Sequence, residues 1–273
     1  MEFKELGRTS VKVPVIGMGT WEIGGGISRD TTHDNEAIRA IRKAIGLGMT
    51  LIDTAEMYAA GHAEELVGEA IKPFRRKQLF LVSKVAPYNL HYNDVIRAAE
   101  KSLERLKTYW LDLYLIHHPN PRVPLKETIA AMEKLVERGL VRFIGVSNFD
   151  IDQMEEARSY LSKNEIVVNQ VEYNLLARGI ERDVLPYCVQ HQITVMAYRP
   201  LAGGELSRNK FLREIGQRYQ KTASQVALNW LITRENVIAI PKAVNPEHLE
   251  QNAGAAGWEL SKDDIERLSS HFH

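Results

Sequence analysis

An acid, a phenol, an amine and an imidazole stand at or just beyond the ends of three consecutive apolar runs of the chain. These four residues are Asp53, Tyr58, Lys84 and His117. Residues two apart on a strand point to the same side, so each run places its polar member on a face shared with apolar neighbours. If the runs are adjacent parallel strands, the four groups meet at one point. Such a set suits proton transfer to or from a polar bond of a substrate.

Lys84 is the least expected of these groups, because it interrupts an apolar run from Phe80 to Val85. A buried ammonium is unfavourable unless an anion pairs with it, and Asp53 is the nearest candidate in the predicted arrangement. Two other interpretations stay open. The pair could be a structural salt bridge at the rim of the sheet, or Lys84 could be the nucleophile of a Schiff-base lyase.

Two further sequence patterns resemble known ligand sites, a metal site and a dinucleotide-binding glycine loop, but neither has the residue spacing that such a site requires. His117 and His118 are adjacent, so on a strand they face opposite sides, and no other His, Cys or Asp cluster has metal-ligand spacing. We therefore expect no metal. The glycines between positions 17 and 26 do not match G-x-G-x-x-G, since Glu22 occupies the third glycine position. They predict instead a turn that lets the backbone lie close to a ligand.

The ends of the later apolar runs carry amides, hydroxyls and one lysine. They are Ser147, Asn148, Gln170, Tyr198 and Lys242. Amides and hydroxyls can bind a carboxamide, and the face of an aromatic ring can stack on a flat heterocycle. Just beyond, Asn245 and Pro246 predict the start of a helix whose N-terminus could bind phosphate. Together these groups predict a nucleotide lying across the later strands.

Eight short apolar runs rich in β-branched residues recur along the chain, and segments of helical period separate them. The runs are Val13 to Met18, Thr50 to Asp53, Leu79 to Val85, Leu111 to His117, Val141 to Ser147, Val167 to Val171, Thr194 to Tyr198 and Val237 to Ile240. Predicted helices include Asn35 to Leu47 and Asn93 to Leu106, the latter with Asn93 or Asp94 as its N-cap. The alternation predicts an α/β protein built as a (β/α)8 TIM barrel. A doubly wound open sheet is the alternative.

Segments outside the eight repeats complete the predicted fold. Phe3 to Leu6 and Val11 to Val13 flank Gly7 to Ser10 and predict a β-hairpin at the bottom of the barrel, with a frayed terminus as the alternative. Asn245 to Ala253 and Ser261 to Ser269 predict extra C-terminal helices. Because no linker, repeat or low-complexity tract interrupts the chain, residues 1–273 are expected to form a single domain.

Composition limits the expected partners and compartment. The 273 residues include 35 acidic and 35 basic side chains, so the field that attracts nucleic acid or an anionic membrane is absent, and neither is an expected partner. The one cysteine, Cys188, has no partner for an intramolecular disulfide, and the charged N-terminus is unlike a secretory signal. We expect a cytoplasmic protein, a monomer or small homo-oligomer, with Cys188 packed in a helix.

In the order and spacing of its motifs, the sequence resembles the aldo-keto reductases along essentially the whole chain. The matching stretches are Gly17-Met18-Gly19-Thr20-Trp21, Asp53-Thr54-Ala55-Glu56-Met57-Tyr58, Ser83-Lys84, Leu111 to His117, Gly145-Val146-Ser147-Asn148-Phe149, Asn169-Gln170 and Ile240-Pro241-Lys242. The resemblance implies a barrel that binds NADP(H), or NAD(H) with weaker preference, without a Rossmann domain. It also implies reversible reduction of aldehydes or ketones to alcohols.

The same resemblance implies residue roles. Asp53, Tyr58, Lys84 and His117 would form a catalytic tetrad, with Tyr58 as proton donor and Lys84 drawing the pKa of that phenol down. The nicotinamide would contact Asp53, Ser147, Asn148, Gln170 and Tyr198, and the remainder of the cofactor Gly19, Thr20, Trp21, Pro200, Leu201, Lys242, His248, Gln251 and Asn252. A small carbonyl substrate would contact Trp21, Tyr58, His117 and His118.

Four positions depart from the family pattern. His118 stands where tryptophan is common, Ala243 where serine is usual, Gln251 where glutamate is usual, and His248 where an arginine often binds the adenine and 2′-phosphate. These changes weaken the expected preference for NADP(H) but leave the tetrad intact. A cofactor-sensing regulatory subunit with little turnover is the remaining alternative.

Overall fold

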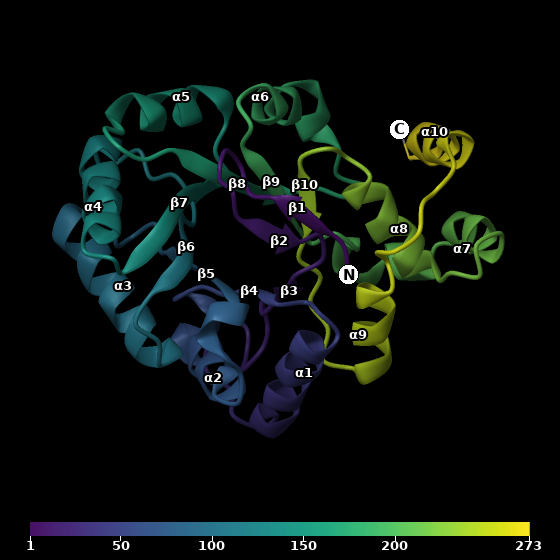
Figure 1. Cartoon of the computed structure of the whole chain (residues 1–273), viewed down its shortest axis with the longest axis horizontal. Coiled ribbons are helices and arrows are strands. Elements are labelled where there is room, and N and C mark those ends of the chain that lie inside the picture. Colours follow the sequence, from purple (N-terminus) through teal and green to yellow (C-terminus); the bar gives the residue numbers. More distant parts are fainter. Residues whose placement is uncertain (273) are drawn as a thin grey trace.

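Eight parallel strands curl around a central axis in the computed structural model, which describes residues 1–272 (Figure 1). Within these residues the strands are β3 (Met18–Gly19), β4 (Leu51–Asp53), β5 (Phe80–Val85), β6 (Leu111–Ile116), β7 (Val141–Ser147), β8 (Ile166–Glu172), β9 (Thr194–Tyr198) and β10 (Val237–Ala239). They pair in chain order from β3 to β10, and a parallel bridge between Ile16 and Ala239 joins the two ends. The (β/α)8 barrel is confirmed, and a doubly wound sheet is excluded because that fold reverses its strand order.

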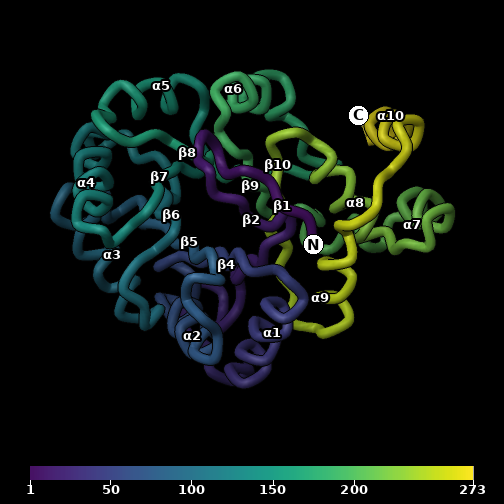
Figure 2. Tube along the Cα trace, viewed as in Figure 1, coloured from purple at the N-terminus to yellow at the C-terminus, as the bar shows by residue number. Residues whose placement is uncertain are grey.

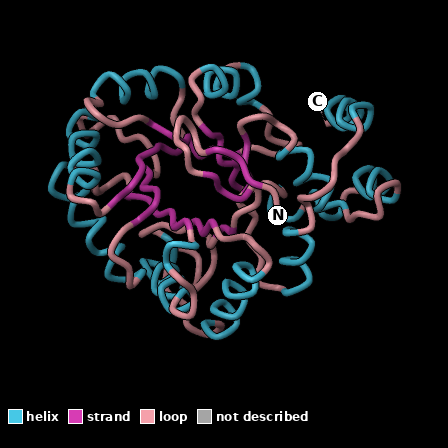
Figure 3. The backbone as a smooth tube through the Cα atoms, viewed as in Figure 1, coloured by secondary structure: helices cyan, strands magenta, loops and turns pink. Residues whose placement is uncertain are grey.

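Helices surround the strands on the outside, as Figure 3 shows. They are α1 (Asp34–Gly46), α2 (His62–Ile71), α3 (Tyr92–Leu106), α4 (Leu125–Glu137), α5 (Ile151–Tyr160), α6 (Val184–Gln190), α7 (Lys210–Gln217), α8 (Ala223–Ile232), α9 (Pro246–Ala253) and α10 (Lys262–His271). The predicted C-terminal helices are α9 and α10, and the side chains of Asn245 and Ser261 cap them. None of the helices in residues 1–272 is long and apolar enough to cross a membrane.

Two layers of apolar side chains hold the barrel together. In the barrel interior, enclosed by the strands, one buried cluster includes Leu51, Val82 and Leu115. The residues that alternate with them point outward and pack beneath the helices, as Ile52 and Tyr114 do. The two-residue alternation predicted for these strands is therefore confirmed, and it directs the polar residues at the strand ends toward the barrel axis.

The N-terminal hairpin lies across one end of the barrel (Figure 2). Its antiparallel strands are β1 (Phe3–Glu5) and β2 (Lys12–Pro14), and Leu6 and Val13 are fully buried among the residues of the barrel interior. The predicted hairpin at the bottom of the barrel is confirmed. The predicted first barrel strand, Val13 to Met18, is wrong at its start. The hairpin uses the first two residues, and Pro14 has no N–H with which to continue the pairing.

Lys4 ties the hairpin to a segment near the other end of the chain. Its Nζ donates to the carbonyl oxygens of Ile232 at 2.6 Å, Val237 at 3.0 Å and Arg234. These acceptors extend from the last residue of α8 to the first residue of β10. Burial lowers the pKa of Lys4 to about 8, and the charge of Glu2 acts in the opposite direction. Three acceptors match the three N–H groups of the ammonium, which explains why this lysine can be largely enclosed.

The N-cap predicted for α3 differs from the one in the structure. The N-cap of α3 is His91, without a side-chain hydrogen bond, rather than Asn93 or Asp94. Acidic side chains also stabilise the first turn of a helix from within it, so Asp94 marks the first turn and not the cap.

Cys188 is buried in α6 as predicted, and burial raises the pKa of its thiol to about 12.

Candidate active site

Lys84 lies at the centre of the polar groups, near the end of β5, and has no exposed surface. Its Nζ donates to Asp53 Oδ2 at 2.8 Å, to the carbonyl oxygen of Thr54 at 2.9 Å and to Tyr58 Oη at 3.1 Å. The register of β4 on β5 places Asp53 beside Val82, which brings the carboxylate within reach of the lysine. Three of the four predicted residues are thus in direct contact, and each N–H of the ammonium has an acceptor.

Burial and charge act in opposite directions on the protonation of this group. Burial by itself lowers the pKa of Lys84, but the Asp53 carboxylate and then Tyr58 raise it above its ordinary value, so Lys84 is cationic at neutral pH. Burial raises the pKa of Tyr58, and the Lys84 ammonium offsets only part of that effect. Lys84 thus lowers the pKa of Tyr58, in the direction expected from the sequence, but burial has the larger effect. The phenol is protonated at neutral pH, which is the state that can donate a proton.

Tyr58 is carried by a short segment between β4 and α2 that neighbouring residues hold in place. Glu56 Oε1 accepts a hydrogen bond from the backbone N–H of Ala86 at 2.6 Å, which fixes the segment to the end of β5. Directly after the tyrosine, Ala59 and Ala60 have left-handed backbone conformations, with φ of 50° and 54°. These conformations are unfavourable for alanine, so the surrounding contacts must maintain them. No local sequence pattern predicts this arrangement.

His117 follows β6 and is neutral in this site. Burial, followed by the charge of Lys84 and by His118, lowers its pKa to about 2. Its ring lies edge-on to Tyr58 with centroids 5.7 Å apart, and its buried Nδ1 has no hydrogen-bond partner in the described part of the chain. Among residues 1–272 no group of three or more His, Cys, Asp or Glu side chains is placed to hold a metal ion. A neutral imidazole beside a phenol can orient an oxygen atom bound between them.

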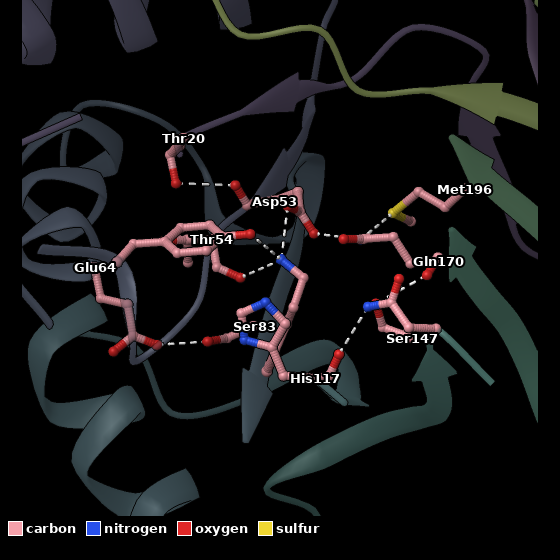
Figure 4. Close-up of polar contacts among 12 residues, drawn as sticks. Thr20, Asp53, Thr54, Glu64, Ser83, His117, Ser147, Gln170 and Met196 are labelled. Atoms are coloured by element: carbon pink, nitrogen blue, oxygen red, sulfur yellow. Dashed lines mark hydrogen bonds and ion pairs between the residues drawn. The ribbon is translucent and has the colours of Figure 1, made fainter. Parts of the chain in front are cut away.

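Hydrogen bonds connect this group to the ends of β7 and β8 (Figure 4). Gln170 Nε2 donates to Asp53 Oδ1 at 2.7 Å, and Ser147 Oγ donates to the carbonyl oxygen of Gln170 at 2.8 Å. Asn148 Nδ2 donates to the carbonyl oxygen of His117 at 3.1 Å. Both carboxylate oxygens of Asp53 are therefore bonded, and the amides predicted to bind a cofactor adjoin the predicted tetrad.

Three side-chain rings lie where this hydrogen-bond network meets the protein surface. Trp21 is 43% exposed and lies edge-on to Tyr58 with centroids 5.1 Å apart. His118 is exposed, and its ring is parallel to that of the preceding residue. Tyr198, at the end of β9, is half-buried and donates from its hydroxyl to Asn148 Oδ1 at 3.0 Å. The structure thus brings three of the residues predicted for substrate and nicotinamide contact to the partly exposed border of the hydrogen-bond network.

Gly19 pairs with Asp53 in the sheet, and Thr20 directly follows Gly19. Thr20 Oγ1 donates to the carbonyl oxygen of Asp53 at 3.0 Å, and both residues are buried. A Cβ added to Gly19 would lie 2.7 Å from the carbonyl oxygen of Ile240. A glycine is therefore required here by the close approach of two backbone segments that are far apart in the sequence.

The segment after β9 is folded into short turns. Pro200 is buried and Leu201 packs against the outer core. Two 3-10 turns follow, η4 (Ala202–Gly204) and η5 (Leu206–Arg208), before α7 begins. Two of the predicted cofactor contacts thus adjoin Tyr198 in the chain and directly precede these turns.

The residues predicted to bind the distant part of a nucleotide lie after β10 and on α9. Lys242 has a side chain that is 34% exposed, and its Nζ lies 3.5 Å from Glu22 Oε2. His248 is exposed and Gln251 is half-buried. Asn252 is only 2% exposed, so little of it is available to a ligand. The ion pair between Lys242 and Glu22 was not predicted, because it joins segments far apart in the sequence.

The fold and this site define a class of oxidoreductase. Residues 15–272 match the model of the aldo/keto reductase family, and the chain belongs to that family. It is 45% identical to the methylglyoxal reductase YeaE of Escherichia coli (strain K12), over 96% of this chain and 92% of that protein. It is also similar to the solved structure of the thermostable aldo-keto reductase Tm1743 with the inhibitor epalrestat, at 47% identity and a TM-score of 0.95 over 99% of both chains. An aldo-keto reductase from Klebsiella pneumoniae in complex with NADPH is 42% identical, with a TM-score of 0.89 over 96% of this chain and 92% of that one.

Proposed function

We propose that the chain is an NADP(H)-dependent reductase of small aldehydes and ketones, with Tyr58 as the proton donor. The observation that carries this proposal is the buried contact of Lys84 with both Asp53 and Tyr58, beside the neutral ring of His117. It provides an O–H group that can give up a proton, next to a cation that stabilises the phenolate left behind. Membership of the aldo/keto reductase family supports the same class of reaction.

In this reaction the carbonyl carbon accepts a hydride and the carbonyl oxygen accepts a proton, which together give an alcohol. A bound reduced nicotinamide supplies the hydride and is itself oxidised. Tyr58 Oη gives its proton to the oxygen, and the resulting phenolate lies 3.1 Å from the Lys84 ammonium until solvent returns a proton. His117 orients the oxygen toward Tyr58, and Asp53 keeps Lys84 charged. The reverse reaction uses the phenolate as a base.

The donor set of the chain fits a nicotinamide dinucleotide. Hydroxyl and amide groups of Ser147, Asn148 and Gln170 gather at one edge of the site, where they can hold a carboxamide, and the half-buried Tyr198 offers a ring face for stacking. Lys242 supplies a cation close in sequence to the N-terminus of α9, and a phosphate bound there would compete with Glu22. We infer that NADP(H) is preferred and that NAD(H) binds more weakly.

The direct test mixes the purified protein with methylglyoxal and either NADPH or NADH and follows the nicotinamide absorbance. Methylglyoxal is chosen because the related protein of Escherichia coli is named as its reductase. We expect turnover with both cofactors and a higher kcat/KM with NADPH. Binding of NADPH without turnover of any small aldehyde would support a cofactor-sensing subunit instead. Borohydride trapping of a substrate adduct on Lys84, without nicotinamide, would support a Schiff-base lyase.

The proposed function is accompanied by three further proposals, on domain organisation, cellular compartment and oligomeric state. We infer that residues 1–273 form a single domain, which the family match over residues 15–272 supports. We place the protein in the cytoplasm, since a lone buried thiol fits a reducing compartment. We expect a monomer or small homo-oligomer without nucleic-acid or membrane partners, and sedimentation analysis would give the oligomeric state.

Replacing His248 by arginine should strengthen the binding of NADPH selectively. His248 is exposed in the first turn of α9, where an arginine could make a bidentate charged contact with a 2′-phosphate that an imidazole cannot make. We expect the Kd for NADPH to fall by about tenfold, the effect of one charged hydrogen bond, and the Kd for NADH to change little. Fluorescence titration measures both values. Equal tightening of the two cofactors would show that position 248 does not face the 2′-phosphate.

A further inference from the structure

A buried carboxyl group lies behind the proposed reaction centre and has no role in the proposed proton transfer. Glu64, on α2, has no exposed surface. The hydroxyl of Ser83 donates to its Oε1, a bond that Figure 4 shows. Nε of Arg105 donates to its Oε2 at 2.7 Å. Burial raises the pKa of Glu64, and the guanidinium of Arg105 acts in the opposite direction. One buried side chain thus joins α2 to both β5 and α3.

The first of these contacts reaches the residue next to the lysine of the site. Ser83 and Lys84 are consecutive in β5, so their side chains point to opposite faces of the strand. Ser83 points outward to Glu64, and Lys84 points inward, where its Nζ donates to Tyr58. Because consecutive residues share a planar peptide group, the bond to Glu64 restrains the backbone from which Lys84 extends.

The second contact reaches the segment that carries the tyrosine. Tyr58 is followed by three residues with left-handed backbone conformations, the last of which is Gly61 with φ of 92°. At Gly61 the backbone lies directly against Arg105, since an added Cβ would be 2.9 Å from both Cδ and Nε of that side chain. The hydrogen bond with Glu64 holds Arg105 in this place. Glu64 therefore also supports the strained turn after Tyr58.

We propose that Glu64 is a positioning residue that sets the contact between Tyr58 and Lys84 from the outer side of the strands. This inference rests on the proposed carbonyl reduction, which depends on that contact. Tyr58 and Lys84 belong to different elements, and Glu64 bonds to a support of each one. Without these bonds the two groups could move apart from their 3.1 Å separation. Proton transfer would then slow, and the ammonium would lower the pKa of the phenol less.

Ser83→Ala isolates one of the two contacts, because it removes a single hydroxyl and keeps the pair of Glu64 with Arg105. We expect the single-turnover rate of methylglyoxal reduction to fall by roughly tenfold, less than the hundredfold that a displacement of about 1 Å can cost. The Kd for NADPH should stay the same. Ser83→Thr, which keeps the hydroxyl, should recover most of the rate.

The pH profile gives a readout that a loss of stability alone would not move. Oxidation of the alcohol product needs the phenolate of Tyr58, so its rate rises as that group loses its proton. If the Lys84 ammonium lies further away in Ser83→Ala, the pKa of Tyr58 rises and the oxidation profile shifts to higher pH. The profile of Ser83→Thr should match that of the wild type.

Thr194→Val is the matched control for these variants. Thr194 is buried at the start of β9, and its hydroxyl accepts a hydrogen bond from the backbone N–H of Gly7 at 2.8 Å. This contact lies at the opposite end of the barrel from the proposed site. The substitution also removes a buried hydroxyl and should lower the free energy of unfolding. The reduction rate and the pH profile should stay as in the wild type.

The kinetic outcomes separate this inference from the proposed function. If the wild type reduces methylglyoxal and Ser83→Ala keeps the rate and pH profile of Thr194→Val, the role of Glu64 is only structural, and the inference is overturned while the proposed function stands. If the wild type reduces no small aldehyde with either cofactor, the proposed function fails and the positioning role fails with it.

A second test does not depend on whether Ser83→Ala folds. The double variant Glu64→Leu with Arg105→Met replaces the buried pair by apolar side chains, a change that often leaves stability unchanged or higher. Urea unfolding should therefore show a folded protein of similar stability. We expect the reduction rate to fall at least as far as in Ser83→Ala, because both contacts of Glu64 are lost. A wild-type rate in the folded double variant would overturn the proposal.

Discussion

Tyr58→Phe should slow carbonyl reduction by about 10²–10⁴ and leave the affinity for NADPH nearly unchanged. The substitution removes the proposed acid, and general acid catalysis contributes a factor of that size. Lys84 keeps Asp53 and Thr54 as acceptors, so the buried ammonium stays paired and the fold should be retained. Single-turnover oxidation of NADPH measures the rate, and fluorescence titration measures the affinity.

Tyr114→Phe is the matched control for this variant. Tyr114 is also fully buried, but it packs in the outer layer, and its hydroxyl has no hydrogen-bond partner in the described part of the chain. Removal of an unpaired buried hydroxyl should leave turnover unchanged and the free energy of unfolding equal or higher. Turnover of Tyr58→Phe within a few-fold of wild type would mean that another group supplies the proton.

Lys84→Met should destabilise the fold and remove most activity. Asp53 would keep a buried carboxylate with an unpaired Oδ2, and breaking a buried ion pair in this way costs about 3–5 kcal/mol of unfolding free energy. The pKa of Tyr58 should rise further, since the ammonium would no longer oppose the effect of burial. We expect reduction at neutral pH to slow by at least about a hundredfold. Alcohol oxidation, which needs the phenolate, should require higher pH than in the wild type.

The double variant Asp53→Asn with Lys84→Met separates the two effects. It removes the unpaired charge, so urea unfolding should show that much of the lost stability returns, whereas the rate should stay low because the cation beside Tyr58 is still absent. Recovery of both stability and rate would show that Lys84 is needed only for the structure. In that case the structural salt bridge considered from the sequence would be the correct interpretation.

The barrel could be predicted because strand alternation is a local property that the fold preserves. Along β5, Val82 and Lys84 face the interior and Ser83 faces Glu64 on α2, as a two-residue period requires. The first strand could not be assigned correctly from its apolar character alone. The apolar run that begins at Val13 contributes first to the hairpin and then to the barrel sheet. Only the three-dimensional pairing of the strands shows where the hairpin ends and the barrel begins.

The candidate site could be predicted in position but not in electrostatics. Asp53, Lys84 and His117 follow from strand direction, yet the pKa of Tyr58 depends on how burial compares with the charge of one ammonium at 3.1 Å. That balance requires the actual geometry. In the same way, the contact between Asn148 Nδ2 and His118 Nδ1 joins residues thirty positions apart in the chain, and no local pattern predicts it.

The contact of Lys4 with the carbonyl groups between the end of α8 and the start of β10 has a consequence for biosynthesis. The ribosome makes the hairpin long before its partner segment, because the acceptor on Ile232 is 228 residues further along the chain. Until that segment has emerged, Lys4 lacks its acceptors, and Leu6 and Val13 lack the later strands that complete the interior around them. The lower end of the barrel can therefore close only after Val237 has been synthesised, so the nascent chain must keep the apolar residues of the hairpin from aggregating until then.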